Sequence, residues 1–175
     1  MSAIVKLADN SSVYEVAKVS PLSIATQLSK KFANQVYLKR EDDQIIHSFK
    51  LRGAYQKMSS MSDEQKAKGV IASSAGNHAQ GVALGASKLS IKATIVMPTS
   101  TPQIKVRAVQ GLGAEVILFG DVYDDAFVHA KKLVSEKDLC FISPYDDFEV
   151  IAGQATVAKE ILAQLNKIDY VFSPV

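Results

Sequence analysis

Lys50 is the residue of this sequence whose surroundings best suit covalent chemistry. It follows Phe49 directly, in the run His47-Ser48-Phe49-Lys50-Leu51-Arg52-Gly53-Ala54, where a loop is expected to pass into a helix. A lysine amine can form an imine with a carbonyl compound, and the backbone holds a lysine at an element boundary in place. Beside an apolar ring the amine would lose water. Its pKa would then fall below the usual value of about 10.4, which frees it to attack an aldehyde.

Two plainer interpretations stay open on these residues alone. A lysine on a solvated helix face would have the same neighbours, and the residues by themselves favour that interpretation. Lys39 is a competing candidate, in the run Lys39-Arg40-Glu41-Asp42. That run is a cluster of charges at a strand end, which internal ion pairing can satisfy.

A strand followed by small residues and a helix start forms a second candidate site. Val70–Ser73 is an apolar run, Ser74-Ala75-Gly76 is small throughout, and a helix is expected from His78. Small side chains let a ligand approach the backbone, and a helix start offers unpaired amides and positive potential. The stretch therefore predicts an anion site for a carboxylate or a phosphate, with the amide of Asn77 at its mouth.

Other site types are not predicted. Gly76 and Gly81 have the spacing of a P-loop, but Val82 stands where lysine is required, and Gly111-Leu112-Gly113 lacks the third glycine of a dinucleotide fingerprint. The three histidines share no metal-ligand spacing with each other or with Cys140, so we expect no metal site. His129 is expected at the surface. The adjacent acidic pairs are interpreted as helix caps and solvated turns: Asp42-Asp43, Asp124-Asp125 and Asp146-Asp147.

Composition narrows the class of protein and its compartment. The net charge of +2 gives no support to binding of nucleic acid or an anionic membrane. There is no apolar run of about 18 residues, and the first twelve residues lack a signal-peptide pattern. Cys140 is the only cysteine, which fits a reducing compartment, and its apolar neighbours predict that it is buried. We expect a cytoplasmic protein.

Short β-branched runs alternate with helical patterns, which predicts an α/β fold with mainly parallel sheets flanked by helices. The expected strands are Val36–Lys39, Val70–Ser73, Ala93–Met97, Glu115–Phe119, Leu139–Ile142 and Tyr170–Phe172. The expected helices are Pro21–Phe32, Phe49–Ser60, His78–Leu89, Pro102–Leu112, Tyr123–Ser135 and Phe148–Leu165.

Several boundaries have a local cause. Ser62 stands three residues before Gln65, which is the capping-box spacing. Thr101-Pro102 has the pattern of a cap followed by proline at the first helical position. Glycines 111, 113 and 120 fall where elements should end. The last run, Asp169 to Val175, has the pattern of a strand with no helix after it, so we expect a chain that is the N-terminal part of a longer protein.

Several motifs, in order and over residues from about 13 to 175, resemble the threonine dehydratase (threonine deaminase) family. This family belongs to the tryptophan synthase β-like, fold type II enzymes that use pyridoxal 5'-phosphate. The matching runs are Tyr37–Asp42, Ser48–Ala54, Ser74–Gly81, Ile95–Pro98, Pro144–Asp146 and Ile151–Gln154.

The resemblance implies a function and roles for particular residues. Lys50 would hold pyridoxal phosphate covalently and remove the Cα proton of the substrate. Phe49 would pack on the cofactor ring and Asn77 would bond its 3′-oxygen. The substrate carboxylate would lie against a loop of Ser74, Ala75, Gly76 and His78. The implied reaction is β-elimination from L-threonine, with L-serine as a second substrate. It gives 2-oxobutanoate and ammonia, in the first step of isoleucine biosynthesis.

The resemblance also implies an architecture and leaves two alternatives. Residues 52–145 would form a smaller α/β lobe, and residues 1–51 and 146–175 would be parts of a larger, incomplete lobe, in a protein that forms homo-oligomers. One alternative is a serine dehydratase or racemase, although Ala75 stands where racemases carry a serine that can act as a base. The other is a non-catalytic fragment, because the family's phosphate-binding glycine loop would follow Ser173-Pro174-Val175.

Overall fold

A four-stranded parallel sheet forms the centre of the chain in the computed structural model, which describes residues 3–173. Its strands lie in the order β5 (Glu115–Leu118), β4 (Ala93–Met97), β3 (Val70–Ser73), β6 (Cys140–Phe141), and every neighbouring pair is parallel. Every residue of β3 is buried, as expected of an inner parallel strand covered on both faces. This confirms the predicted α/β class.

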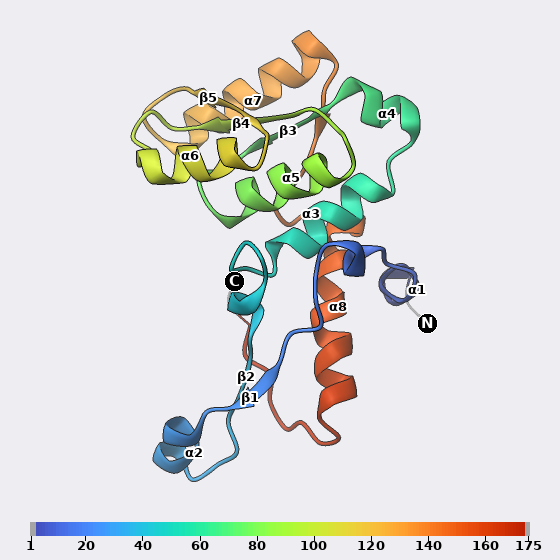
Figure 1. Cartoon of the computed structure of the whole chain (residues 1–175), viewed down its shortest axis with the longest axis vertical. Helices are drawn as coiled ribbons and strands as arrows, with labels where there is room; N and C mark the ends of the chain where they lie inside the picture. Colours follow the sequence, from blue (N-terminus) through green and yellow to red (C-terminus); the bar gives the residue numbers. More distant parts are fainter. Residues whose placement is uncertain (1–2, 174–175) are drawn as a thin grey trace.

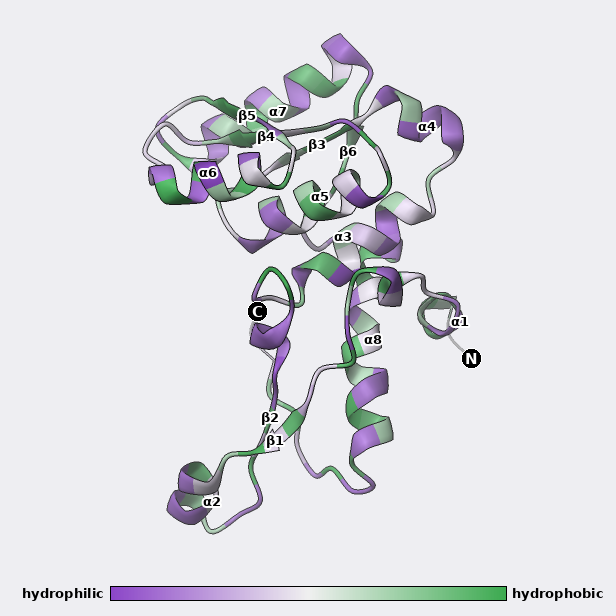
Figure 2. Cartoon of the chain, viewed as in Figure 1, coloured by the Kyte–Doolittle hydropathy of each residue, from purple (hydrophilic) through white to green (hydrophobic). Residues whose placement is uncertain are grey.

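Helices cover both faces of the sheet (Figure 1). Val70 and Ala72 share a core cluster with residues of α5 (Asn77–Lys88) and α6 (Gln103–Gly111). Ile71 points to the other face, where it meets α7 (Tyr123–Lys137). This alternation follows from the two-residue period of a strand. Figure 2 shows the hydrophobic residues gathered on these strands, while α4 (Asp63–Lys68) is largely hydrophilic.

The remaining elements lie beyond α3 (Lys50–Ser59), which runs between them and the sheet (Figure 1). β1 (Leu22–Ile24) and β2 (Tyr37–Lys39) form an antiparallel hairpin with Leu22 opposite Lys39. The other elements are α1 (Ala3–Asp9), η1 (Val13–Glu15), α2 (Thr26–Phe32), η2 (Glu41–Asp43) and α8 (Phe148–Gln164). No helix among the described residues is long and apolar enough to cross a membrane.

Two predicted elements were wrong. The helix expected over Pro21–Phe32 is shorter and begins at Thr26, because Leu22–Ile24 pairs with β2 instead. The strand expected over Tyr170–Phe172 does not form, and these three side chains are largely exposed. A strand needs a partner for its ladder of hydrogen bonds, and no described residue supplies one there. Pro174 and Val175 lie outside the described residues.

The predicted boundaries had mixed outcomes. The Ser62–Gln65 capping box is present. Thr101 does not cap α6, since Pro102 occupies the N-cap and the Thr101 hydroxyl is buried without a hydrogen-bond partner among the described residues. Gly113 and Gly120 end their elements with φ values of 95° and 68°, which favour glycine. Cys140 is half-buried rather than buried, because β6 lies at the sheet edge.

Candidate functional site

Lys50 is the first residue of α3, so the helix start fixes where its side chain leaves the backbone. The Ser48 hydroxyl accepts the Lys50 backbone N–H at 3.2 Å. The Lys50 amine donates to the carbonyl oxygen of Pro144 at 2.9 Å and lies 5.5 Å from the centre of the Phe49 ring. No carboxylate in the described part of the chain forms an ion pair with it.

Partial burial lowers the pKa of the Lys50 amine from its ordinary value. Loss of water destabilises the charged ammonium, and one neutral carbonyl stabilises that charge less than a carboxylate would. The free-base fraction of Lys50 at neutral pH is therefore larger than that of an exposed lysine. This is the property that a nucleophilic amine requires.

Lys39 does not have this property. Its amine lies 2.6 Å from Glu160 Oε2 and also donates to the Ser20 carbonyl at 2.7 Å. The predicted internal pairing of the Lys39–Asp42 cluster holds only for Arg40 with Asp42, at 2.7 Å. Lys39 and Glu41 pair instead with residues of α8 and α3. Since Lys39 is bound in a buried ion pair, Lys50 is the better candidate of the two.

Glycine brings α5 against the start of α3. A Cβ at Gly81 would lie 3.0 Å from the Lys50 carbonyl oxygen and 3.2 Å from Leu51 Cα. At Gly85, one turn further along α5, a Cβ would collide with the Met58 side chain at 2.5 Å. Gly81, the second glycine of the spacing that resembles a P-loop, is thus a helix-packing residue. It also brings the start of α5 close to Lys50.

The loop before α5 has the features predicted for an anion site. Ser74 N donates to the Val96 carbonyl at 3.2 Å, and Gly76 N donates to Ser74 Oγ at 3.2 Å. Gly76 is the N-cap of α5 and provides no side-chain cap, so the first-turn amides stay available. A Cβ at Gly76 would meet no heavy atom within 4 Å, which leaves open space beside this backbone. Asn77 is exposed at the first position of α5.

His78 is turned away from this loop. Its ring is buried, and Nε2 lies 3.0 Å from the carbonyl oxygen of Ile142. The pKa of His78 is lowered to about 4, chiefly by burial; the hydrogen bond to Ile142 O opposes this decrease and the positive charge of Lys50 adds to it. The ring is therefore neutral at pH 7, and Nε2–H donates to Ile142 O. Any contact of His78 with a ligand in the loop would have to use its backbone N–H.

A buried ion network beside Lys50 was not predicted from the sequence. The Arg52 side chain is fully buried and donates to Glu41 at 2.8 Å, to Glu160 at 2.6 Å and to Thr156 Oγ1 at 3.1 Å. Burial raises the pKa of Glu160, but hydrogen bonds from Arg52 and Lys39 outweigh it, so the pKa lies below its ordinary value. The sequence gives little sign of this network, because Glu160 is far along the chain from Glu41 and Arg52.

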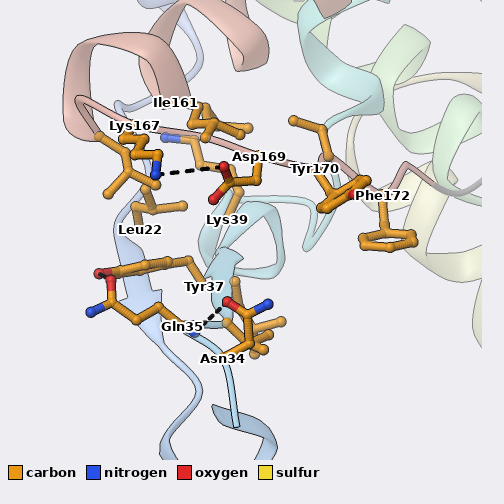
Figure 3. Close-up of a pocket in the computed structure, with 15 residues that line it drawn as sticks. Leu22, Asn34, Gln35, Tyr37, Lys39, Ile161, Lys167, Asp169, Tyr170 and Phe172 are labelled. Carbon is orange, nitrogen blue, oxygen red and sulfur yellow. Dashed lines mark hydrogen bonds and ion pairs between the residues drawn. The ribbon is translucent and has the colours of Figure 1, made fainter. Parts of the chain in front are cut away.

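Figure 3 shows a separate hollow, with a volume of about 550 Å³. It is bounded by the hairpin and the chain after α8, and Figure 3 shows Tyr37, Lys39, Asp169 and Tyr170 around it. None of the predicted site residues lines it. We therefore place the candidate site at Lys50 and the start of α5, where an amine and unpaired amides occur together.

These features define a class of protein. A desolvated lysine amine, open space at a glycine and an uncapped helix start fit an aldehyde cofactor with an acidic substrate group. A model of the pyridoxal-phosphate dependent enzyme family matches residues 14–175, and the chain belongs to this family.

Curated relatives indicate which members of this family the chain resembles. The chain is 56% identical over 98% of its length to a biosynthetic L-threonine dehydratase of Haemophilus influenzae, covering 33% of that protein. It is 56% identical over 93% of its length to a chloroplastic biosynthetic threonine dehydratase of Arabidopsis thaliana, covering 28% of it. The chain thus spans about a third of the length of these curated relatives. These matches confirm the resemblance to threonine dehydratases.

Solved structures give the same result for the fold. Processed threonine deaminase isoform 2 of Solanum lycopersicum matches with a TM-score of 0.92 and 50% identity, over 94% of this chain and 46% of that one. Maize serine racemase matches with a TM-score of 0.89 and 31% identity, over 95% and 50%. The fold is thus that of the fold type II enzymes, as predicted. The roles of the individual site residues and the division into lobes stay predictions.

Proposed function

We propose that the protein carrying this chain is a pyridoxal-phosphate-dependent threonine dehydratase, which converts L-threonine to 2-oxobutanoate and ammonia. L-Serine is the second substrate, and the reaction serves isoleucine biosynthesis. The observation that carries the proposal is the Lys50 amine, held by the Pro144 carbonyl at the start of α3 and free of any carboxylate among the described residues. The names of the relatives support the choice of threonine.

When bound, pyridoxal phosphate supplies an aldehyde that condenses with amines and a ring that stores negative charge from the substrate Cα. In this chain Lys50 Nζ is the group that would hold it. The Phe49 ring lies beside that amine and would cover one face of the cofactor ring. Asn77 would donate its amide to the ring oxygen. These assignments use residues that the structure places at the starts of α3 and α5.

The chain's residues have separate tasks toward the substrate. The backbone amides of Ala75 and His78 and the Ser74 hydroxyl, which already accepts the Gly76 N–H, would bind and orient the carboxylate at the α5 start, where the helix dipole favours an anion. Lys50 Nζ would accept the Cα proton, because its lowered pKa keeps more of the amine in the basic form. Elimination of the β-hydroxyl and hydrolysis then give the keto acid and ammonia.

Racemisation is the second candidate, because maize serine racemase shares the fold at 31% identity. A racemase needs a second proton donor on the opposite ring face. Ala75 has a methyl group that cannot give or take a proton. Elimination is therefore the favoured reaction.

The test is keto-acid release from L-threonine by the protein that carries this chain, with pyridoxal phosphate added. We expect 2-oxobutanoate and ammonia in equal amounts and a loss of turnover of at least about 10³-fold in Lys50→Ala. Lys105→Ala, an exposed lysine on α6, is the matched control and should retain full turnover. Formation of D-serine from L-serine without keto acid would contradict the proposal.

The proposal extends to architecture and location. Residues 52–145 would form the smaller lobe, and residues 1–51 and 146–175 parts of the larger one, with the cofactor between them. The protein would be a cytoplasmic homo-oligomer. Size-exclusion chromatography with light scattering tests the oligomer.

A further inference from the structure

Two side chains from different helices donate hydrogen bonds to two backbone carbonyls of one short segment, Ile142–Pro144. His78, on α5, donates through Nε2 to the carbonyl of Ile142 at 3.0 Å. Lys50, on α3, donates through Nζ to the carbonyl of Pro144 at 2.9 Å. Only Ser143 separates the two acceptors. The position of the Pro144 carbonyl therefore depends on how Ile142 is held.

Ile142 is held on two sides. Its backbone N–H donates to the Ile71 carbonyl at 2.9 Å, which continues the pairing of β6 with β3, and its side chain is fully buried in the main core. Its carbonyl is the acceptor for the buried His78 ring. The segment after Ile142 leaves the sheet, and its next tie to the rest of the site is the Lys50 amine.

We propose that His78 is a positioning residue for Lys50. By holding the Ile142 carbonyl, the neutral ring fixes the segment through Pro144. The Pro144 carbonyl then keeps the Lys50 amine beside Phe49 rather than in solvent. The positive charge of Lys50 also lowers the pKa of His78, which agrees with the closeness of the two side chains. His78 contributes its backbone amide to substrate binding and its side chain to the lysine.

The inference rests on the proposed function for what Lys50 does, but its geometry involves no cofactor. It can therefore be tested on the protein without pyridoxal phosphate. A failure of cofactor binding would count against the proposed function and leave this inference standing. An unaltered Lys50 in the His78 variants would count against the inference alone.

The measurement is competitive acetylation of lysines with trace acetic anhydride across pH 6–11, quantified by peptide mass spectrometry. Wild-type Lys50 should titrate below the ordinary lysine value of about 10.4. In His78→Leu the segment relaxes, water reaches the amine, and the Lys50 midpoint should move toward that ordinary value. The relative free-base fraction of Lys50 at pH 8 then falls by about threefold or more. His78→Gln, whose amide reaches as far as Nε2, should stay within about twofold of wild type.

Two further variants separate positioning from general damage. His78→Asn stays polar but is too short to reach Ile142, so it should behave like His78→Leu and serves if the latter does not fold. His129→Leu, on α7 where His129 stacks on Phe119 at 3.9 Å, is the matched histidine control and should leave the Lys50 profile unchanged. An unshifted profile in folded His78→Asn would overturn the proposal. So would a shift in His78→Gln as large as in His78→Leu.

Discussion

At the scale of single residues, Lys50 and His78 owe their properties to surroundings that lack opposite charge. The Lys50 amine is partly buried and the His78 ring is buried. Each donates a hydrogen bond to a backbone carbonyl instead of a carboxylate. Desolvation therefore decides the direction of both pKa shifts. A larger fraction of the Lys50 amine is therefore in the free-base form, and the His78 imidazole is neutral.

The neutral His78 predicts a pH dependence of stability. An unfolded His78 binds a proton near pH 6.5, whereas the folded one does so only near pH 4. The unfolded state holds more protons between these values, so stability falls as the pH falls through this window. From pH 7 to pH 5 the loss from this group is about 2 kcal/mol.

Urea unfolding at pH 7 and pH 5 measures this loss. His78→Gln cannot titrate, so its free energy of unfolding should decrease less than that of the wild type over the same interval. Parallel decreases in the two proteins would show that His78 is not the titrating group.

At the scale of elements, the sequence predicted those whose pattern is local. Val70–Ser73 and Ala93–Met97 were placed at their observed bounds, because buried parallel strands are continuous apolar runs. The β1–β2 hairpin was missed, since Leu22–Ile24 is a strand only through its partner. The same reason explains the absence of a strand at Tyr170–Phe172. Long-range pairing is not contained in a short pattern.

For the candidate site, too, local features could be predicted from the sequence and long-range contacts could not. The lysine, the small-residue loop and the helix start could be found in the sequence, because motif and local structure coincide there. The tie between Lys50 and Pro144 joins residues 94 positions apart and could not be found. The same holds for Arg52 and Glu160, which are 108 positions apart.

The close approach of α5 to α3 predicts a sensitive glycine. In Gly81→Ala the new methyl group would press on the backbone of Lys50 and Leu51, so the two helices must separate. We expect a loss of about 1–3 kcal/mol in the free energy of unfolding, measured by urea denaturation, and a displaced Lys50.

Gly111→Ala is the matched control for this change. It is exposed at the end of α6, and its Cβ would meet no atom within 4 Å. Its stability should equal or slightly exceed that of the wild type. Equal stability of both alanine variants would contradict the account of helix packing.

At the scale of the whole molecule, a buried network joins the parts of the chain that lie beyond the sheet. Arg52 of α3 reaches Glu41 of η2, Glu160 of α8 and the Lys18 carbonyl. Lys39 of β2 completes it through Glu160. Two cations face two carboxylates, so the network is neutral and its groups satisfy one another. It ties the hairpin and α8 to the helix that begins at Lys50.

Arg52→Met should therefore strongly destabilise the protein, because it leaves two buried carboxylates with too few hydrogen-bond partners. We expect a loss of about 3–5 kcal/mol in the free energy of unfolding, measured by urea denaturation. Arg40→Met removes an ion pair with Asp42 in which both side chains are exposed, and it should change stability little. Similar losses in the two variants would contradict the role given to burial.

The proposed function depends on Lys50 as the lysine that would hold pyridoxal phosphate. The most direct measurement is to add pyridoxal phosphate to the protein at pH 8, trap the bound cofactor with borohydride and map the modified lysine by peptide mass spectrometry. We expect modification concentrated on Lys50, lost in Lys50→Ala and retained in Lys105→Ala. Modification spread evenly over the exposed lysines, with Lys50 no more reactive than the others, would contradict it.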